Sequence, residues 1–204
     1  MADVVAVLPD HEPWFTASDT GPVTAADVAH RQQFGLALFA RRSLARIATR
    51  EAFVHGSYTD HGDAWPRSAR PRAAQVARLR GLDGRTFVIG HLHGVRDSAG
   101  KGDTSARRAQ ATRFAEIVDS LQERGDMLVV CGDLNVLPGS ETLAILGDLG
   151  LTDLVGSADT RTDRYPGSVR HASYLLVSDP SAVRRFEIVP EPEVSDHRVL
   201  LVDL

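Results

Sequence analysis

Short apolar runs alternate with polar, glycine-rich stretches along most of the chain. Runs of four to six residues rich in Val, Ile and Leu are typical of buried β-strands. They predict strands at 4–8, 35–40, 45–54, 86–90, 127–131, 174–177, 186–189 and 199–202, and favour a strand over a helix at 70–80. Residues 10–33 are polar and contain Pro13 and Pro22, which predicts a loop with a short helix after Thr24.

Two further segments have the pattern of helices. Apolar residues recur at helical spacing between Ser105 and Arg124, and Gly125 follows. Residues 140–149 begin with Ser140, a good N-cap, and end near two glycines. Strands that alternate with helices indicate an α/β protein, and 204 residues are most simply one domain spanning 1–204.

Composition and charge limit the classes of function. The net charge of −4 argues against a sequence-independent grip on nucleic acid, which needs a basic face. Two arginine clusters are interpreted as solvated helix faces, although a local basic patch remains open; they are Arg67, Arg70, Arg72, Arg78 and Arg80, and Arg107, Arg108 and Arg113.

The lone cysteine and the absence of long apolar stretches bear on disulfides, metal sites and the location of the protein. Cys131 rules out an internal disulfide and a cysteine-based zinc site, and is predicted to be a small buried hydrophobe. No signal peptide and no apolar run of the ~18 residues needed to span a bilayer is visible. The default expectation is a cytoplasmic protein without a membrane span.

A Gly-Asp-Leu-Asn segment follows the strand predicted at 127–131. In an extended segment, Asp133 and Asn135 point to the same side. A carboxylate and an amide oxygen there suit a hard cation such as Mg²⁺, or orient an attacking water. The alternative is an Asx-type turn that caps the strand end.

Three histidines and a neighbouring aspartate are further candidates for metal binding, phosphate binding or proton transfer. Asp196 and His197 precede the last strand; the carboxylate is a candidate metal ligand, and the imidazole can contact a phosphate oxygen or shuttle a proton. The alternative there is a surface turn. His91 and His93 follow the strand at 86–90, where a phosphate contact by one of them is favoured over zinc binding, and a hydrogen-bonded loop role stays open.

Four motifs in order resemble those of the endonuclease/exonuclease/phosphatase superfamily. They are GLALFAR at 35–41, VIGHL at 88–92, VCGDLN at 130–135 and SDH at 195–197. The resemblance covers about residues 2–204. It implies a four-layer α/β sandwich, in which two packed mixed β-sheets are flanked by helices as in DNase I, and hydrolysis of phosphoester bonds with Mg²⁺ or Mn²⁺.

The resemblance also implies roles for individual residues. Asp133 would orient or deprotonate the nucleophilic water, and Asn135 would hold the phosphate or the water. His91 would contact the phosphate, with His93 as the alternative. His197 would stabilise charge on the phosphoryl oxygens.

The metal side of the site departs from the family pattern. Asp196 matches a metal ligand, but Pro9 stands where the family has its principal acidic ligand, so Asp10 is the possible substitute. The chain begins at what is read as the second strand of the family. A missing first strand would leave an open sheet edge that a protein partner or a second copy would cover.

A third departure affects the catalytic histidine. Ser173 stands where the family has an aspartate that hydrogen-bonds this histidine. A hydroxyl can orient His197 but cannot stabilise an imidazolium by charge. His171 is either a new substrate-binding group beside Ser173 or a strand-end residue.

Three hypotheses follow, because some positions match the family pattern and others depart from it. The first is a divergent metal-dependent phosphoesterase that acts on a phosphodiester or a phosphomonoester, with the choice between a small phosphate compound and nucleic acid left open. The second is a catalytically impaired binding or regulatory module. The third is another chemistry that reuses the histidines. Substrate contacts are expected in residues 55–69, which can also be a plain surface loop.

Overall fold

A six-stranded mixed sheet forms the centre of the computed structural model, which describes residues 2–25, 28–66 and 70–204. β6 and β7 run parallel, and the other neighbours are antiparallel. In spatial order the strands are β3 (Ala45–His55), β5 (Arg72–Arg80), β6 (Thr86–Leu92), β7 (Met127–Asp133), β9 (Ser173–Val177) and β8 (Thr152–Asp153).

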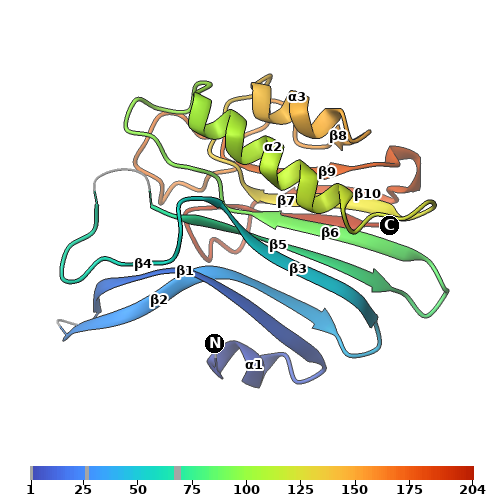
Figure 1. The fold of residues 1–204 in the computed structure, drawn as a ribbon, viewed down its shortest axis with the longest axis horizontal. Coiled ribbons are helices and arrows are strands. Elements are labelled where there is room, and N and C mark those ends of the chain that lie inside the picture. The colour runs from blue at the N-terminus through green and yellow to red at the C-terminus, as the bar shows by residue number, and fades with distance from the viewer. Residues whose placement is uncertain (1, 26–27, 67–69) are drawn as a thin grey trace.

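Two smaller sheets complete the β-structure. One is a long antiparallel ribbon extended by a parallel two-residue strand, and the other is an antiparallel pair. The ribbon packs on β5, below the six-stranded sheet in Figure 1. The strands are β1 (His11–Ala25), β2 (Val28–Arg41) and β4 (Thr59–Asp60) in the first, and β10 (Arg185–Val189) and β11 (Val199–Asp203) in the second.

Helices cover both outer faces. α2 (Ser105–Asp119) and α3 (Glu141–Gly147) lie over the six-stranded sheet, and the short α1 (Ala2–Val7) lies under β1 (Figure 1). A single 3-10 turn, Pro180–Ala182, precedes β10. The layers confirm the predicted four-layer α/β sandwich. None of the described helices is long and apolar enough to cross a bilayer.

The core lies between α2 and the central strands. Phe114 and Val118 on α2 are fully buried and pack over Gly90 of β6, where a Cβ would lie only 3.0 Å from the Phe114 ring. Cys131 packs against this core as predicted, and burial raises the pKa of its thiol to about 11. A thiol that stays protonated at neutral pH is a poor nucleophile.

The backbones of β6 and β7 approach each other closely at the edge of the sheet where both strands end. Gly132 has φ 141°, and a Cβ on it would lie 1.9 Å from the carbonyl oxygen of Leu92. Just beyond, the Gly94 N–H donates to the Asp133 carbonyl at 2.7 Å. The ends of β6 and β7 are thereby fixed together, which places Asp133 beside the segment that carries His93.

The N-terminal predictions were wrong. Residues 4–8 were predicted as a strand, but α1 includes residues 4–7, so the interpretation of this run as the family's second strand fails. Residues 10–33 were predicted as a loop with a short helix after Thr24, but they form β1 and much of β2 in the described part of the chain. The side chains that β1 buries are polar, namely Thr16, Ser18 and Asp19, so no apolar alternation marks the strand.

The remaining elements follow the hydrophobic pattern. The predicted strands at 45–54, 70–80, 86–90, 127–131, 174–177, 186–189 and 199–202 are all present, and the strand at 35–40 is the end of β2. Thr104 and Ser140 cap the two predicted helices, which end earlier than expected, at Asp119 and Gly147. Two-residue strands such as β8 carry no pattern that the sequence could reveal.

Candidate functional site

A cavity of about 570 Å³ opens where β6 and β7 end. It is lined by loops after these strands, by the segment at 160–170 and by the loop before β11. Its charged and catalytic-type side chains are Arg70, Arg72, His93, Arg96, Asp97, Lys101, Arg107, Asp133, Asn135, Arg161, Asp196 and His197. Cavities of this size suit small ligands.

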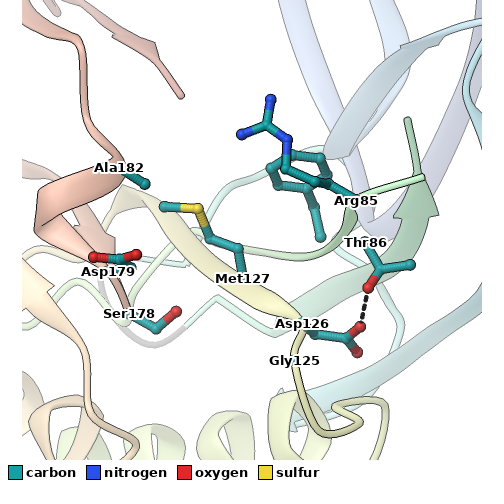
Figure 2. A pocket seen from close by; sticks show the side chains of 9 residues that line it. Arg85, Thr86, Gly125, Asp126, Met127, Ser178, Asp179 and Ala182 are labelled. Carbon is teal, nitrogen blue, oxygen red and sulfur yellow. Dashed lines mark hydrogen bonds between the residues drawn. The ribbon is translucent and has the colours of Figure 1, made fainter. Parts of the chain in front are cut away.

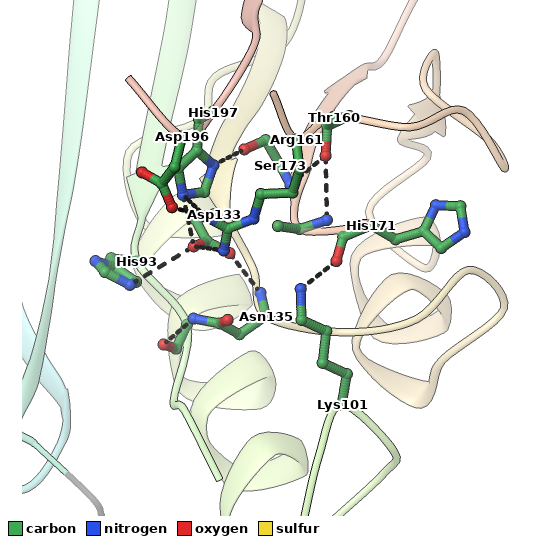
Figure 3. Close-up of polar contacts among 12 residues, drawn as sticks. His93, Lys101, Asp133, Asn135, Thr160, Arg161, His171, Ser173, Asp196 and His197 are labelled. Carbon is green, nitrogen blue, oxygen red and sulfur yellow. Dashed lines mark hydrogen bonds and ion pairs between the residues drawn. The ribbon is translucent and has the colours of Figure 1, made fainter. Parts of the chain in front are cut away.

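Asp133 lies at the centre of the site and uses its two carboxylate oxygens differently (Figure 3). Oδ1 accepts a hydrogen bond from the Asn135 N–H at 3.0 Å, which is the Asx-type turn considered from the sequence. Oδ2 faces the cavity, 3.4 Å from Nε2 of His197. Asn135 has φ 54° and its amide donates to the Gly94 carbonyl at 3.2 Å, so its position is fixed by the turn.

Ser173 and His197 meet as the sequence predicts. Oγ of Ser173 lies 2.8 Å from Nδ1 of His197. On the other side of the ring, Nε2 accepts from an Arg161 nitrogen at 2.5 Å. Nδ1 therefore carries the proton and donates it to the serine oxygen. The pKa of His197 is lowered, mainly by burial, with Arg161 adding to the shift and Asp133 opposing it. The imidazole is neutral.

Arg161 is the side chain that sequence reasoning missed. One of its terminal nitrogens donates to both Asp196 Oδ2 and His197 Nε2 at 2.5 Å, and the other lies 3.4 Å from Asp133 Oδ2. Only 7% of the side chain is exposed, and the guanidinium stacks on the Tyr165 ring at 4.3 Å. The sequence shows only an arginine within a polar loop, so it gives no signal that would have singled this residue out.

Of the two candidate phosphate-binding histidines, His93 rather than His91 lines the cavity. His93 Nε2 lies 3.8 Å from Asp133 Oδ2, and the pKa of this half-exposed imidazole is lowered by its partial burial in the cavity and by the charge of Arg72. His91 is within β6, paired with Gln75 and Cys131 on the neighbouring strands. His93 follows the end of β6, whereas His91 lies inside the strand, so only His93 reaches the cavity.

His91 gives the protein a distinct acid sensitivity. Burial lowers its pKa to about 4, whereas the unfolded chain has a histidine pKa of about 6.5. Below pH 6.5 only the unfolded state takes up this proton, so stability is full above pH 6.5 and falls as the pH drops toward 4. At pH 5 the loss from His91 alone should be about 2 kcal/mol.

Urea unfolding at pH 7 and pH 5 measures this loss. We expect the difference between the two pH values to shrink by about 2 kcal/mol in His91→Gln. An equal difference in the variant would contradict the assignment. Paired carboxylates such as Asp126, whose pKa is lowered although burial alone would raise it, destabilise only at lower pH.

Besides His91, two further predicted site residues lie away from the cavity. Asp10 precedes β1 and is not at the cavity; it is nine residues from Asp19, which contacts the cavity residue Arg70, or about 30 Å along an extended strand. The His171 ring points away from the cluster in Figure 3, with Nδ1 3.1 Å from the Ala158 carbonyl. Its own carbonyl accepts from Lys101, which lines the cavity.

The cavity wall is cationic. Six Arg or Lys side chains line it against three Asp, and buried Asp19 neutralises one of the six, Arg70, through bonds of 2.6 and 2.9 Å. The excess is two positive charges. Arg72 and Arg107 are buried and donate to loop carbonyls, and burial lowers the pKa of Arg72 to about 10.

The arginine clusters in the sequence were therefore the useful signal. Their interpretation as solvated helix faces is wrong for Arg70, Arg72 and Arg107, whereas Arg108 is an exposed helix residue paired with Glu141. Arg67 lies outside the described residues. The local basic patch, considered as the alternative, is present.

Within residues 55–69, the described part supports the cavity wall. His61 lies 3.1 Å from Asp19, and the Trp65 ring stacks under the Arg70 guanidinium at 4.0 Å. Pro66 lines the cavity, while residues 67–69 lie outside the described residues. His55, Tyr58, His61 and Trp65, where substrate contacts were expected, do not line it.

A second, smaller cavity of about 250 Å³ lies at the opposite ends of β6 and β7 (Figure 2). Both carboxylates that line it are already engaged. Asp126 is bonded to Thr86, Arg78 and the Glu123 N–H, and Asp179 accepts from the N–H and the hydroxyl of Ser181. Its functional groups serve the fold, and no predicted site residue lines it.

The donor set does not fit a magnesium site. Among the described residues, no three His, Cys, Asp or Glu side chains form a group that could bind a metal ion. Asp133 and Asp196 both line the cavity, but both form ion pairs with Arg161. Hard cations rely on several carboxylate and carbonyl oxygens, and Asp10, the expected additional ligand, is not at the cavity.

Several solved protein structures share this architecture. The chain is similar to mannosyl-6-phosphatase from Bacteroides thetaiotaomicron (17% identity over 99% of this chain and 79% of that one, TM-score 0.69). It is also similar to the human Nocturnin catalytic domain with bound sulfate (19%, 100% and 76%, 0.67) and to D. rerio TDP2 with a single-stranded DNA product (11%, 98% and 80%, 0.63).

These identities show a shared fold and no more. No curated protein sequence matches the chain significantly. The model of the Endonuclease/Exonuclease/phosphatase family matches residues 5–197, which is most of the chain and includes all four motifs. The chain belongs to the Endonuclease/Exonuclease/phosphatase family.

Proposed function

We propose that the cavity binds the phosphate group of a small phosphate ester and hydrolyses its ester bond. Membership of a family of phosphatases and nucleases supports a phosphoesterase kind of function. The observation that carries the proposal is the position of Asp133 Oδ2, 3.4 Å from the His197 imidazole inside a cavity with excess positive charge. An anionic substrate is attracted to such a cavity.

The residues divide the chemistry as follows. Asp133 accepts a proton from water as the water oxygen bonds to phosphorus, and the ester P–O bond breaks. Arg161 and Lys101 neutralise charge on the phosphoryl oxygens. The departing alkoxide takes a proton from solvent, which reaches the cavity at the exposed rim beside Asp196, whose side chain is 49% exposed. The long 3.4 Å contact between Arg161 and Asp133 is weak enough for a phosphate to replace.

The substrate class follows from the size of the cavity. About 570 Å³ accommodates a phosphate and a compact organic group. The similar structures include a sugar phosphatase and a protein that binds single-stranded DNA, so monoesters and diesters both belong in the test. The overall negative charge favours the small ester over nucleic acid.

Replacing His197 tests the proposed chemistry. In His197→Ala, Arg161 loses the acceptor that fixes its guanidinium beside Asp133, so the positive charge is no longer held at the phosphoryl oxygens and kcat/KM should fall about a hundredfold. Hydrolysis of p-nitrophenyl phosphate and bis(p-nitrophenyl) phosphate measures it. His171→Ala is the matched control, because this ring points away from the cavity, and it should keep the wild-type rate. Equal rates for both variants would contradict the proposal.

One observation favours a second candidate, a module that binds phosphate without hydrolysing it. Arg161 contacts the carboxylate oxygen that would act as base. If that contact persists with ligand bound, Asp133 cannot accept a proton. Saturable phosphate binding without turnover of either substrate would identify this function.

A further inference from the structure

Arg161 lies where two carboxylates and an imidazole converge. Its guanidinium bonds Asp196 and His197 and lies against Asp133. Two carboxylates that contact the same guanidinium would repel each other without its positive charge. The guanidinium supplies that charge from within the chain.

The backbone holds Arg161 in this place. Its N–H donates to Asp159 at 3.1 Å, and its carbonyl accepts from Arg170 and Arg198, each at 3.0 Å. Residues 161 and 197 form an antiparallel bridge. The loop that carries the arginine is thus joined directly to the segment that carries the catalytic-type histidine, and the side chain arrives in a fixed geometry.

The guanidinium retains capacity for a ligand. Nε of Arg161 is buried and has no hydrogen-bond partner in the described structure. Leaving such a donor unpaired costs free energy that an anion can recover. A planar guanidinium also matches phosphate oxygens, to which it can donate two parallel bonds.

From these contacts we infer that Arg161 takes the place of the divalent cation, so that this cavity binds phosphate without a metal ion. The inference rests on the proposed function, whose substrate is a phosphate ester. It assigns to a side chain the charge that relatives in the family commonly obtain from bound metal. The lack of a three-donor group around Asp133 among the described residues agrees with it.

Binding of inorganic phosphate to the full chain tests the inference without any variant. Isothermal titration calorimetry in excess EDTA and in excess Mg²⁺ should give the same affinity. Binding that is lost in EDTA and restored by Mg²⁺ would overturn the inference. The two proposals fail separately: phosphate binding and turnover that both require metal would overturn the inference while the proposed function survives. Phosphate binding in EDTA without turnover would do the reverse.

Variants then assign the binding to Arg161. In Arg161→Gln, affinity for phosphate should fall about tenfold to a hundredfold, the usual effect of losing charged hydrogen bonds. Arg161→Lys should retain part of the affinity. Arg164→Gln is the control, because Arg164 belongs to the same loop, is 60% exposed and pairs with Glu193. Unchanged binding in Arg161→Gln would overturn the inference.

A metal titration adds a readout independent of phosphate. Removing the guanidinium frees Asp133 and Asp196, so Arg161→Gln should bind Mn²⁺ more tightly than the wild type, as followed by electron paramagnetic resonance. Circular dichroism checks that the variant is folded. Tighter Mn²⁺ binding by the wild type than by Arg161→Gln would contradict the competition between guanidinium and metal.

Discussion

Replacing Asp133 by asparagine is expected to lower kcat about a thousandfold without unfolding the protein. An amide cannot accept the proton of the attacking water at neutral pH. The shapes are the same, and the amide oxygen can still accept from the Asn135 N–H, which preserves the turn. The loss should therefore appear in kcat and not in the melting temperature.

Binding should respond differently from turnover in this variant. Asp133 brings a negative charge to the cavity, so its removal should leave phosphate affinity unchanged or slightly higher. Asp83→Asn is the matched control: Asp83 lies in the hairpin between β5 and β6, at the far end of the sheet, and pairs with Arg85. A kcat for Asp133→Asn close to that of Asp83→Asn would show that Asp133 is not the base.

The second large effect is on stability, at Gly132. Replacement by alanine would place a Cβ 1.9 Å from the Leu92 carbonyl oxygen at a backbone φ of 141°. The Cβ is fixed to the backbone of β7 and the oxygen belongs to the backbone of β6, so neither atom can move without disturbing the ladder. We expect a loss of about 3 kcal/mol or more in the free energy of unfolding, measured by urea denaturation.

Gly84→Ala separates the clash from backbone strain. Gly84 also has a positive φ, 81°, but a Cβ there would have nothing within 4 Å. Its loss should be only about 1 to 2 kcal/mol, the cost of a left-handed conformation. If Gly132→Ala were no more destabilising than Gly84→Ala, the close approach of β6 and β7 would not contribute as described.

The predictable part of the fold was the part whose strands carry apolar residues. β6, β7 and β9 bury mainly Val and Leu, and their pattern is plain in the sequence. β1 instead buries Thr16, Ser18 and Asp19, whose partners come from distant segments such as Glu51 and Arg70. Polar burial of this kind depends on tertiary contacts that local periodicity does not encode.

The site could be predicted where short motifs end a strand. Asp133, Asn135 and His197 all line one cavity, and Ser173 meets His197 as expected. The metal side could not be predicted, because Asp10 was assigned from a strand that the structure shows as a helix. Arg161 reaches the site from a loop through its long side chain, and nothing in the sequence near it marks that reach.

The most direct measurement of the central claim is phosphate release from p-nitrophenyl phosphate and bis(p-nitrophenyl) phosphate by the wild-type protein, in EDTA and then with Mg²⁺ or Mn²⁺. A cavity that hydrolyses phosphate esters predicts turnover that inorganic phosphate inhibits competitively. The inference about Arg161 further predicts that EDTA does not abolish it. Absence of turnover of both substrates under all three conditions would contradict the assignment of this cavity as a phosphoesterase site.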